Sequence, residues 1–89
     1  MSIEEISKER FDSYNPLRHR PADNALTLEV SWFENPEADA IGVIVKDKRY
    51  EDYSAVSFAR ANRLEYQACD VTVRISSLSG AKEYLSDMM

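Results

Sequence analysis

The residues of this chain that most often carry chemistry are few and far apart. Its single histidine, His19, lies between Arg18 and Arg20, and its single cysteine, Cys69, follows fifty residues later. Metal binding needs several imidazole, thiolate or carboxylate ligands that converge, and neither a CxxC nor an HxxxH spacing occurs. The flanking arginines disfavour protonation of His19. We therefore expect no metal, no cofactor, and His19 in an exposed loop.

Other arrangements typical of catalysis are also weak. Cys69 comes just before an alternating segment, where a small buried side chain is more usual than a stabilised thiolate. A phosphate cradle needs closely spaced glycines, whereas Gly42 and Gly80 stand alone. The adjacent acids Glu51 and Asp52 resemble a solvated helix start, and catalytic carboxylates need burial that separates their pKa values. The sequence predicts a protein that is not an enzyme.

Composition indicates one small folded domain. The chain has 89 residues, of which 44% are hydrophobic and 30% are charged, with two glycines and three prolines. These are globular values, and a chain of this length has room for one core. The N-terminus lacks the apolar stretch of a signal peptide, no segment is apolar over a membrane-spanning length, and a lone thiol suits a reducing compartment. We expect a single cytoplasmic domain over residues 1–89.

Residues 1–24 are predicted to form a helix and a loop that precede the main body of the domain. Ser2 and Glu5 make a capping-box pattern for a helix over about residues 2–13. The following YNPLRHRPADN contains two prolines, which lack a backbone donor and restrict their neighbours, so it is predicted to be a loop. Residues 25–89 then supply the sheet and the remaining helices.

Three segments alternate between apolar and polar residues as strands do. The alternation in residues 25–33, ALTLEVSWF, predicts that Phe33 lies on the face opposite Leu26, Leu28, Val30 and Trp32. Residues 40–46 and 70–76 alternate in the same way. The turn residues ENPEAD join the first two strands into a hairpin with an acidic tip.

The segment from Glu51 to Tyr66 fits neither a strand nor a helix cleanly. As a strand it would present a poor face of small residues, Ala55, Ser57 and Ala59. As a helix it begins with acids, carries arginines toward its end and contains no Gly or Pro, which suits both propensity and the helix macrodipole. We predict a helix, with a strand in a four-stranded sheet as the alternative.

The order of elements predicts the fold class. After Ser77 the apolar residues recur at helical spacing, which predicts a C-terminal helix through Ala81, Tyr84, Leu85 and Met88. The order is then α-β-β-α-β-α, and the crossover between the second and third strands leaves the first strand in the middle. The predicted fold is α+β, a small three-stranded antiparallel sheet in the order 2-1-3 with helices packed on it.

The net charge of −5 is unevenly placed, because residues 1–39 hold nine acids and four bases while residues 40–89 hold seven of each. A protein partner with a basic surface is therefore predicted to dock on the hairpin tip and its flank. Phe33 and Ile44 lie opposite the inferred core, where either the N-terminal helix covers them or they join a partner or homodimer interface. The predicted partner-binding residues are Glu29, Glu34, Glu37, Asp39, Phe33 and Ile44.

A basic set competes with this surface as the recognition site. It consists of Lys46, Lys48, Arg49, Arg60, Arg63 and Arg74. Our first hypothesis is a small acidic protein-binding module, such as an adaptor, regulatory subunit or inhibitor of bacterial or phage type. The alternatives are a nucleic-acid-binding module that uses the basic set, and a small enzyme or enzyme subunit. A steep fall in nucleic-acid binding with rising salt would favour the second hypothesis, and capture of a basic protein the first.

Overall fold

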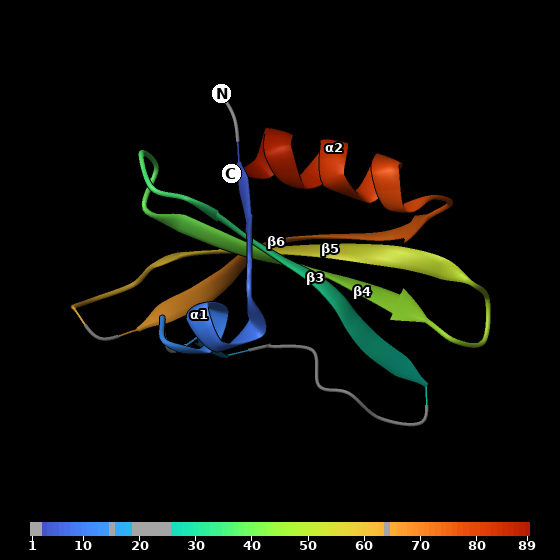
Figure 1. Ribbon diagram of the computed structural model, residues 1–89, viewed down its shortest axis with the longest axis horizontal. Coiled ribbons are helices and arrows are strands. Elements are labelled where there is room, and N and C mark those ends of the chain that lie inside the picture. The colour runs from blue at the N-terminus through green and yellow to red at the C-terminus, as the bar shows by residue number, and fades with distance from the viewer. Residues whose placement is uncertain (1–2, 15, 19–25, 64) are drawn as a thin grey trace.

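The computed structural model describes residues 3–14, 16–18, 26–63 and 65–89. Within them one sheet of six strands runs in the spatial order β1-β3-β4-β5-β6-β2, with two helices packed on it (Figure 1). The elements are β1 (Glu4–Ile6), α1 (Lys8–Asp12), β2 (Pro16–Arg18), β3 (Thr27–Asn35), β4 (Ala40–Asp47), β5 (Asp52–Arg60), β6 (Tyr66–Ile75) and α2 (Leu78–Met88). The fold is α+β, but the prediction of a three-stranded sheet in the order 2-1-3 is wrong.

The centre of the sheet is an antiparallel meander of β3, β4, β5 and β6. Its two edges are completed by short strands from the first part of the chain, since β1 pairs antiparallel with β3 and β2 pairs parallel with β6. The predicted helix over residues 2–13 is therefore only partly present. Helix α1 starts after Ser7, whose side chain accepts a hydrogen bond from the Arg10 backbone nitrogen, and residues 4–6 are extended.

The largest error concerns residues 51–66, which were predicted to be helical. Residues 52–60 form β5, which pairs with β4 over residues 52–59. Two of the three small residues that weakened the strand interpretation are buried, Ala55 fully and Ser57 almost fully, whereas Ala59 is exposed. Ala55 and Ser57 lie opposite Ile44 and Gly42 in the register, under α2, where small side chains let a helix approach the sheet closely. The face of β5 whose small residues argued against a strand is the face on which α2 packs.

A β-bulge also overturns the predicted faces of β3. The register with β4 shifts between Glu29 and Ser31, so one extra residue resets the alternation. Trp32 consequently packs on the α1 side of the sheet, half-buried, whereas Val30 packs on the α2 side. Strict alternation had put these two residues on one face.

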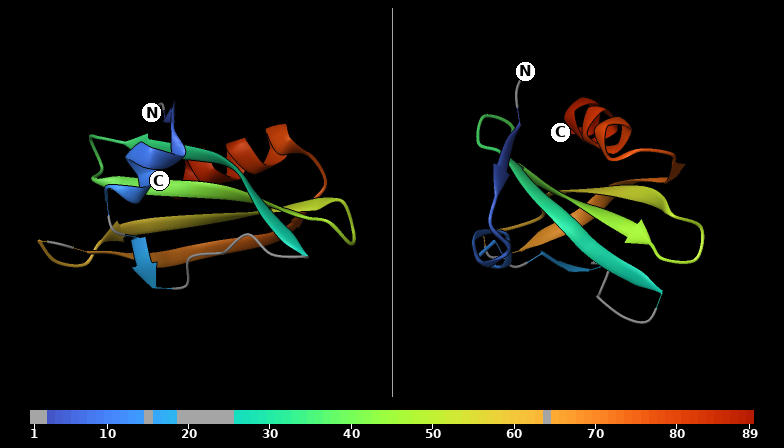
Figure 2. Two further views of the ribbon diagram at one scale, coloured as in Figure 1. Left: turned by 60° about the horizontal axis from the view of Figure 1, so that its bottom comes forward. Right: turned by 45° about the vertical axis from the view of Figure 1, so that its right-hand side comes forward.

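Helix α2 lies over one face of the sheet and α1 lies against the other (Figure 2). An apolar cluster on each face holds these layers together. On one face, Phe11 of α1 is fully buried and meets Phe58 edge to face, with ring centroids 5.8 Å apart. On the other, Ala81 and Leu85 of α2 are fully buried against the sheet. The predicted C-terminal helix is confirmed, and Ser77 caps it by accepting a hydrogen bond from the Gly80 nitrogen at 3.0 Å.

Candidate functional site

The two apolar residues of the predicted partner surface lie inside the protein. Phe33 is 4% exposed and Ile44 is fully buried, both in the cluster beneath α2. The sequence left open whether the N-terminal helix covers them or a partner does; the C-terminal helix covers them. They are therefore not available as an interface in this structure.

The four acids of the predicted partner surface are divided between interior and surface. Glu29 and Glu34 are buried, at 6% and 4% exposure, while Glu37 and Asp39 are exposed in the β3–β4 turn. Asp39 occupies the left-handed region with φ of 54°, which an aspartate tolerates well. Only Glu37 and Asp39 are thus left at the surface of the predicted acidic projection.

Glu34 is the centre of a hydrogen-bonded group that ties α1 to β3. Its carboxylate accepts two hydrogen bonds from the Arg10 guanidinium, at 2.6 and 3.1 Å, and one from the Tyr14 hydroxyl at 2.6 Å. The hydrogen bonds from Arg10 and then from Tyr14 hold the pKa of Glu34 below its ordinary value, against the opposing effect of burial. The charge of Glu34 is therefore neutralised within the fold.

Asp39 makes a second group of the same composition with residues distant in sequence. Its carboxylate pairs with the Arg60 guanidinium and accepts the Tyr66 hydroxyl hydrogen bond at 2.5 Å. The hydrogen bonds from Arg60 and Tyr66 lower the pKa of Asp39. Burial, followed by the bond to Asp39, raises the pKa of Tyr66 to about 12. The rings of Tyr14 and Tyr66 meet edge to face at 5.2 Å, so the two groups form one continuous structure.

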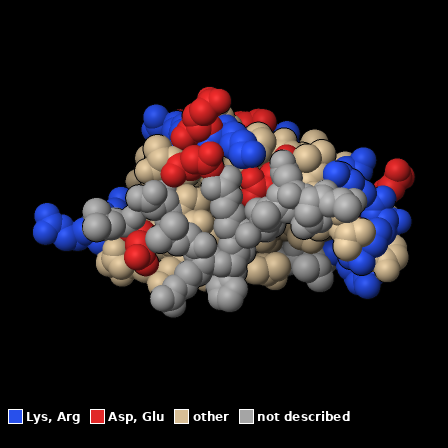
Figure 3. Space-filling model, turned by 90° about the horizontal axis from the view of Figure 1, so that it is seen from below, with Lys and Arg blue, Asp and Glu red and all other residues tan. Residues whose placement is uncertain are grey.

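The six basic residues of the alternative set are separated by the length of β5. Arg60 and Arg63 lie near the β5–β6 turn, whereas Lys46, Lys48 and Arg49 lie at the β4–β5 turn, at the opposite end of the strand. Lys and Arg side chains gather at that second end, on the right in Figure 3. Arg74 of β6 joins them, because its guanidinium lies 5.6 Å from the centroid of the Tyr50 ring.

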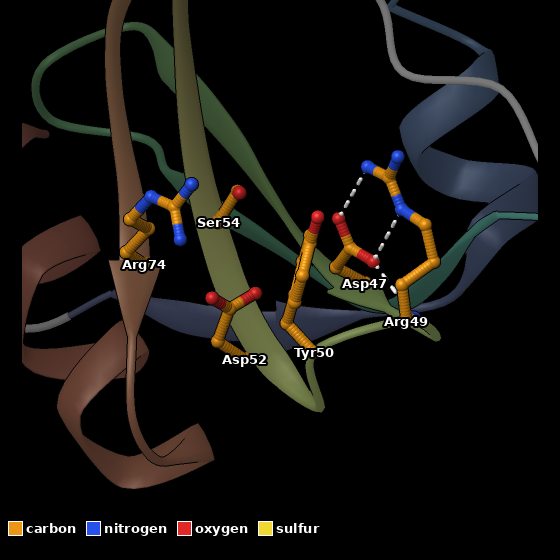
Figure 4. A pocket seen from close by; sticks show the side chains of 6 residues that line it. All are labelled: Asp47, Arg49, Tyr50, Asp52, Ser54 and Arg74. Carbon is orange, nitrogen blue, oxygen red and sulfur yellow. Dashed lines mark hydrogen bonds and ion pairs between the residues drawn. The ribbon is translucent and has the colours of Figure 1, made fainter.

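A pocket of about 220 Å³ opens beside the β4–β5 turn (Figure 4). Its residues come from the end of β4, the turn, the start of β5 and the end of β6; they are Asp47, Arg49, Tyr50, Asp52, Ser54 and Arg74. Asp52 and Ser54 lie on the same face of β5 as Val56 and Phe58, so the pocket continues the α1 face of the sheet. The basic set predicted from the sequence includes both arginines of this pocket, but it also includes Arg60 and Arg63 from the other end of β5.

Tyr50 is the exposed aromatic residue of this pocket, at 60%. The Arg49 guanidinium lies 5.1 Å from its ring centroid, and the Arg74 guanidinium approaches the same ring. Arg49 is fixed in turn by Asp47, which accepts hydrogen bonds from the Arg49 backbone nitrogen at 2.8 Å and from its guanidinium at 3.0 Å. These bonds lower the pKa of Asp47. We call Arg49, Tyr50 and Arg74 the arginine–tyrosine cluster.

Arg74 reaches the cluster because of a β-bulge in β6. Tyr53 and Ala55 of β5 face Ile75 and Thr72, so two steps along β5 match three steps along β6. The extra residue lets Ile75 pack under α2, and Arg74 adopts the left-handed region with φ of 59°. For a residue other than Gly, Asn or Asp this conformation is uncommon. The alternation of residues 70–76 in the sequence does not indicate this bulge.

Other chemistry finds little support in the part of the chain that the structure describes. No group of three His, Cys, Asp or Glu residues is arranged to hold a metal ion there. Cys69 is exposed, and its sulfur lies 3.4 Å from the Ser57 hydroxyl. His19, predicted to lie in an exposed loop, is outside the described residues. None of the described helices is long and apolar enough to cross a membrane.

Comparisons with known proteins found no match, whether the chain was compared with protein-family models, with curated proteins or with solved structures. The site's own geometry is therefore the basis of any functional proposal.

Proposed function

We propose that this protein is a non-catalytic binding module that docks on a partner protein through the arginine–tyrosine cluster. The observation that carries the proposal is Tyr50, a 60% exposed aromatic ring accompanied by two guanidinium groups. Tyr and Arg are the side chains most enriched, with Trp, among the residues that dominate protein interfaces. Arg49 is already held in place by Asp47, so little side-chain entropy remains to be lost when a partner binds.

The cluster favours an acidic patch on the partner. Lys46, Lys48, Arg49 and Arg74 bring four positive charges to this end of the molecule, against the three negative charges of Asp47, Glu51 and Asp52. The acidic projection that the sequence favoured is a weaker candidate, because Glu34 is buried and Asp39 is already paired with Arg60. The partner that fits best therefore carries negative rather than positive charge.

A protein partner suits this surface better than a nucleic acid does. Asp47, Glu51 and Asp52 lie among the basic residues, so the surface offers no continuous track of positive charge for a phosphate backbone. The net charge of −5 also opposes general attraction to nucleic acid. We further propose a regulatory or adaptor role in the cytoplasm, where an exposed thiol such as Cys69 stays reduced.

The test compares two double variants in affinity capture from a lysate of the source organism. Arg49→Ala with Tyr50→Ala removes the centre of the cluster. Arg63→Ala with Tyr84→Ala is a matched control, since both side chains are exposed and lie on other elements. We expect wild type and control to retain the same protein, identified by mass spectrometry, and the cluster variant to lose it.

Two outcomes would contradict the proposal. Equal retention by the cluster variant would mean that recognition uses another surface. Loss of the retained protein after nuclease treatment, with direct nucleic-acid binding that falls steeply with salt, would favour the nucleic-acid hypothesis instead. Circular dichroism of both variants checks that neither result reflects unfolding.

A further inference from the structure

We infer that the pocket beside Tyr50 receives one carboxylate side chain of the partner, which binds to the Arg74 guanidinium and the Ser54 hydroxyl. This inference rests on the proposed function and specifies the group that the docking surface recognises. Figure 4 shows the Arg74 guanidinium directed from β6 across to Ser54 on β5, above the carboxylate of Asp52. The pocket volume of about 220 Å³ suits a side-chain group rather than a large ligand.

Arg74 differs from three other arginines of the described residues, because its guanidinium has no carboxylate partner within them. Arg10, Arg49 and Arg60 each pair with an acid of the chain, namely Glu34, Asp47 and Asp39. Within the described residues, Arg74 makes no hydrogen bond or ion pair, and its one polar contact is with the Tyr50 ring. A guanidinium presents a planar fork of donors that fits a carboxylate with two parallel hydrogen bonds. The fork of Arg74 is available for such a ligand.

The backbone around Arg74 sets where its side chain leaves the sheet. The residue sits at a bulge between two paired strands, with Ile75 next to it buried under α2. Its left-handed conformation is unfavourable for an arginine and persists because the surrounding sheet imposes it. The Arg74 backbone is therefore held beside the pocket, within reach of a ligand for its guanidinium.

Asp52 is the acid nearest to a ligand of this pocket that, within the described residues, is not hydrogen-bonded to an arginine. Its carboxylate lines the same pocket and interacts with the Arg49 guanidinium, whose pKa it helps to raise. Asp52 repels any anion that enters, while the guanidinium groups of Arg49 and Arg74 attract it, and both effects grow with the charge of the ligand. A protein partner supplies its anion as the carboxylate of a glutamate or aspartate, and phosphate is therefore the competing anion in the test.

The test is an NMR titration of the ¹⁵N-labelled full chain with three probes. N-acetyl-glutamate amide carries one carboxylate, N-acetyl-glutamine amide is its neutral counterpart, and inorganic phosphate tests the other anion. We expect saturable shifts of the Arg74 side-chain and Ser54 amide signals with the glutamate probe alone. Arg74→Gln should weaken this binding about tenfold or more, as expected when charge-assisted hydrogen bonds are lost. Arg63→Gln, at the other end of the sheet, should leave it unchanged.

A second variant separates binding from folding. Arg74→Gly removes the guanidinium and suits the left-handed backbone better than arginine does. We therefore expect it to fold at least as stably as wild type while losing the glutamate shifts. Retention of those shifts by the glycine variant, or their absence in wild type, would overturn the inference.

The remaining outcomes distinguish this inference from the proposed function. Saturable binding of phosphate without binding of the glutamate probe would overturn the carboxylate assignment. If the probe fails in wild type but the Arg49 and Tyr50 variant still loses its captured partner, the docking surface stands and the pocket inference alone is wrong. If the probe binds and that variant keeps its partner, Arg49 and Tyr50 are not the docking surface and the proposed function is wrong, whereas the affinity of the pocket for a carboxylate stands.

Discussion

Glu34 and Asp39 illustrate how single residues of this protein hold distant elements together. Each carboxylate accepts hydrogen bonds from one arginine and one tyrosine, and the partners come from α1 and its end in one case and from β5 and β6 in the other. The tyrosine rings touch, so a continuous chain of polar and aromatic contacts runs from α1 to the β3–β4 turn. At the scale of residues, these two acids of the first half of the chain serve the fold.

Replacing Glu34 with Gln tests this role. At neutral pH the variant keeps the shape of the side chain but loses charge-assisted hydrogen bonds, so we expect a loss of about 1–3 kcal/mol in the free energy of unfolding, measured with urea. The folded pKa of Glu34 lies below its ordinary value of 4.5, so its stabilisation is present above that pH and is lost as the pH falls through the folded pKa.

The same argument predicts how the difference depends on pH. The stability gap between wild type and Glu34→Gln should be full at pH 7 and shrink below about pH 4.5. Glu37→Gln serves as the control, because Glu37 is exposed in the turn. A gap that stays constant down to pH 2 would show that the ionised carboxylate is not the stabilising group.

Gly42 is the second residue whose identity the packing dictates. A Cβ atom built on it would lie 2.5 Å from Cδ1 of Leu85, which is fully buried and has little room to move. We expect Gly42→Ala to cost about 1–3 kcal/mol through overpacking. Combining it with Leu85→Ala should be less damaging than the sum of the single changes, because the added methyl enters the space that the leucine leaves. Additive urea-unfolding energies would contradict this contact.

At the scale of elements, α1 depends on tertiary contacts for its existence. It has five residues, too few for an isolated helix, and one of them, Phe11, is buried. Phe11 packs against Phe58 of β5, while Arg10 next to it bonds to Glu34 of β3. Helix α1 therefore links two strands that are not neighbours in the sheet.

Phe11→Ala should weaken the packing of α1 against the sheet. Truncating a fully buried phenylalanine costs about 3–5 kcal/mol, a large share of the stability of a domain of this size. We expect urea unfolding to shift by that amount and amide exchange in residues 8–12 to accelerate more than in α2. Lys8→Ala, an exposed change in the same helix, is the control. Unchanged exchange in α1 would mean that Phe11 does not anchor it.

At the scale of the whole molecule, the two faces of the sheet are both occupied. Helix α2 covers one and α1 covers part of the other (Figure 1). The large apolar side chains that remain exposed in the described parts of the chain are spread over different elements; they are Leu26, Leu28, Tyr50, Val71 and Tyr84. The sequence left open whether one apolar face of the sheet forms a homodimer interface, and α2 covers that face.

We therefore expect the purified protein to be a monomer without its partner. Light scattering after size exclusion should give the mass of one chain across a wide range of concentrations, since stable dimers usually bury a contiguous apolar surface. A dimer mass would contradict this expectation. In that case the dimer should be compared with the Arg49→Ala and Tyr50→Ala variant, to learn whether the cluster is the self-association surface.

Part of this protein could be predicted because the responsible interactions are local. The Ser77 cap and the apolar residues at helical spacing after it determine α2, and the alternation on both sides of the ENPEAD turn determines the β3–β4 hairpin. These signals act within a few residues. They are therefore visible in one sequence without knowledge of the rest of the fold.

Long-range packing decided the rest. Ala55 and Ser57 belong to a strand on which α2 packs, and their small side chains let the helix come close. The bulges in β3 and β6 let residues of these strands pack into the cluster beneath α2. Arg60 finds Asp39 twenty-one residues away, while Arg74 is left facing a pocket. A sequence states which charges and apolar groups are present, but which of them meet depends on contacts between distant segments, and so the candidate site emerged only from the tertiary structure.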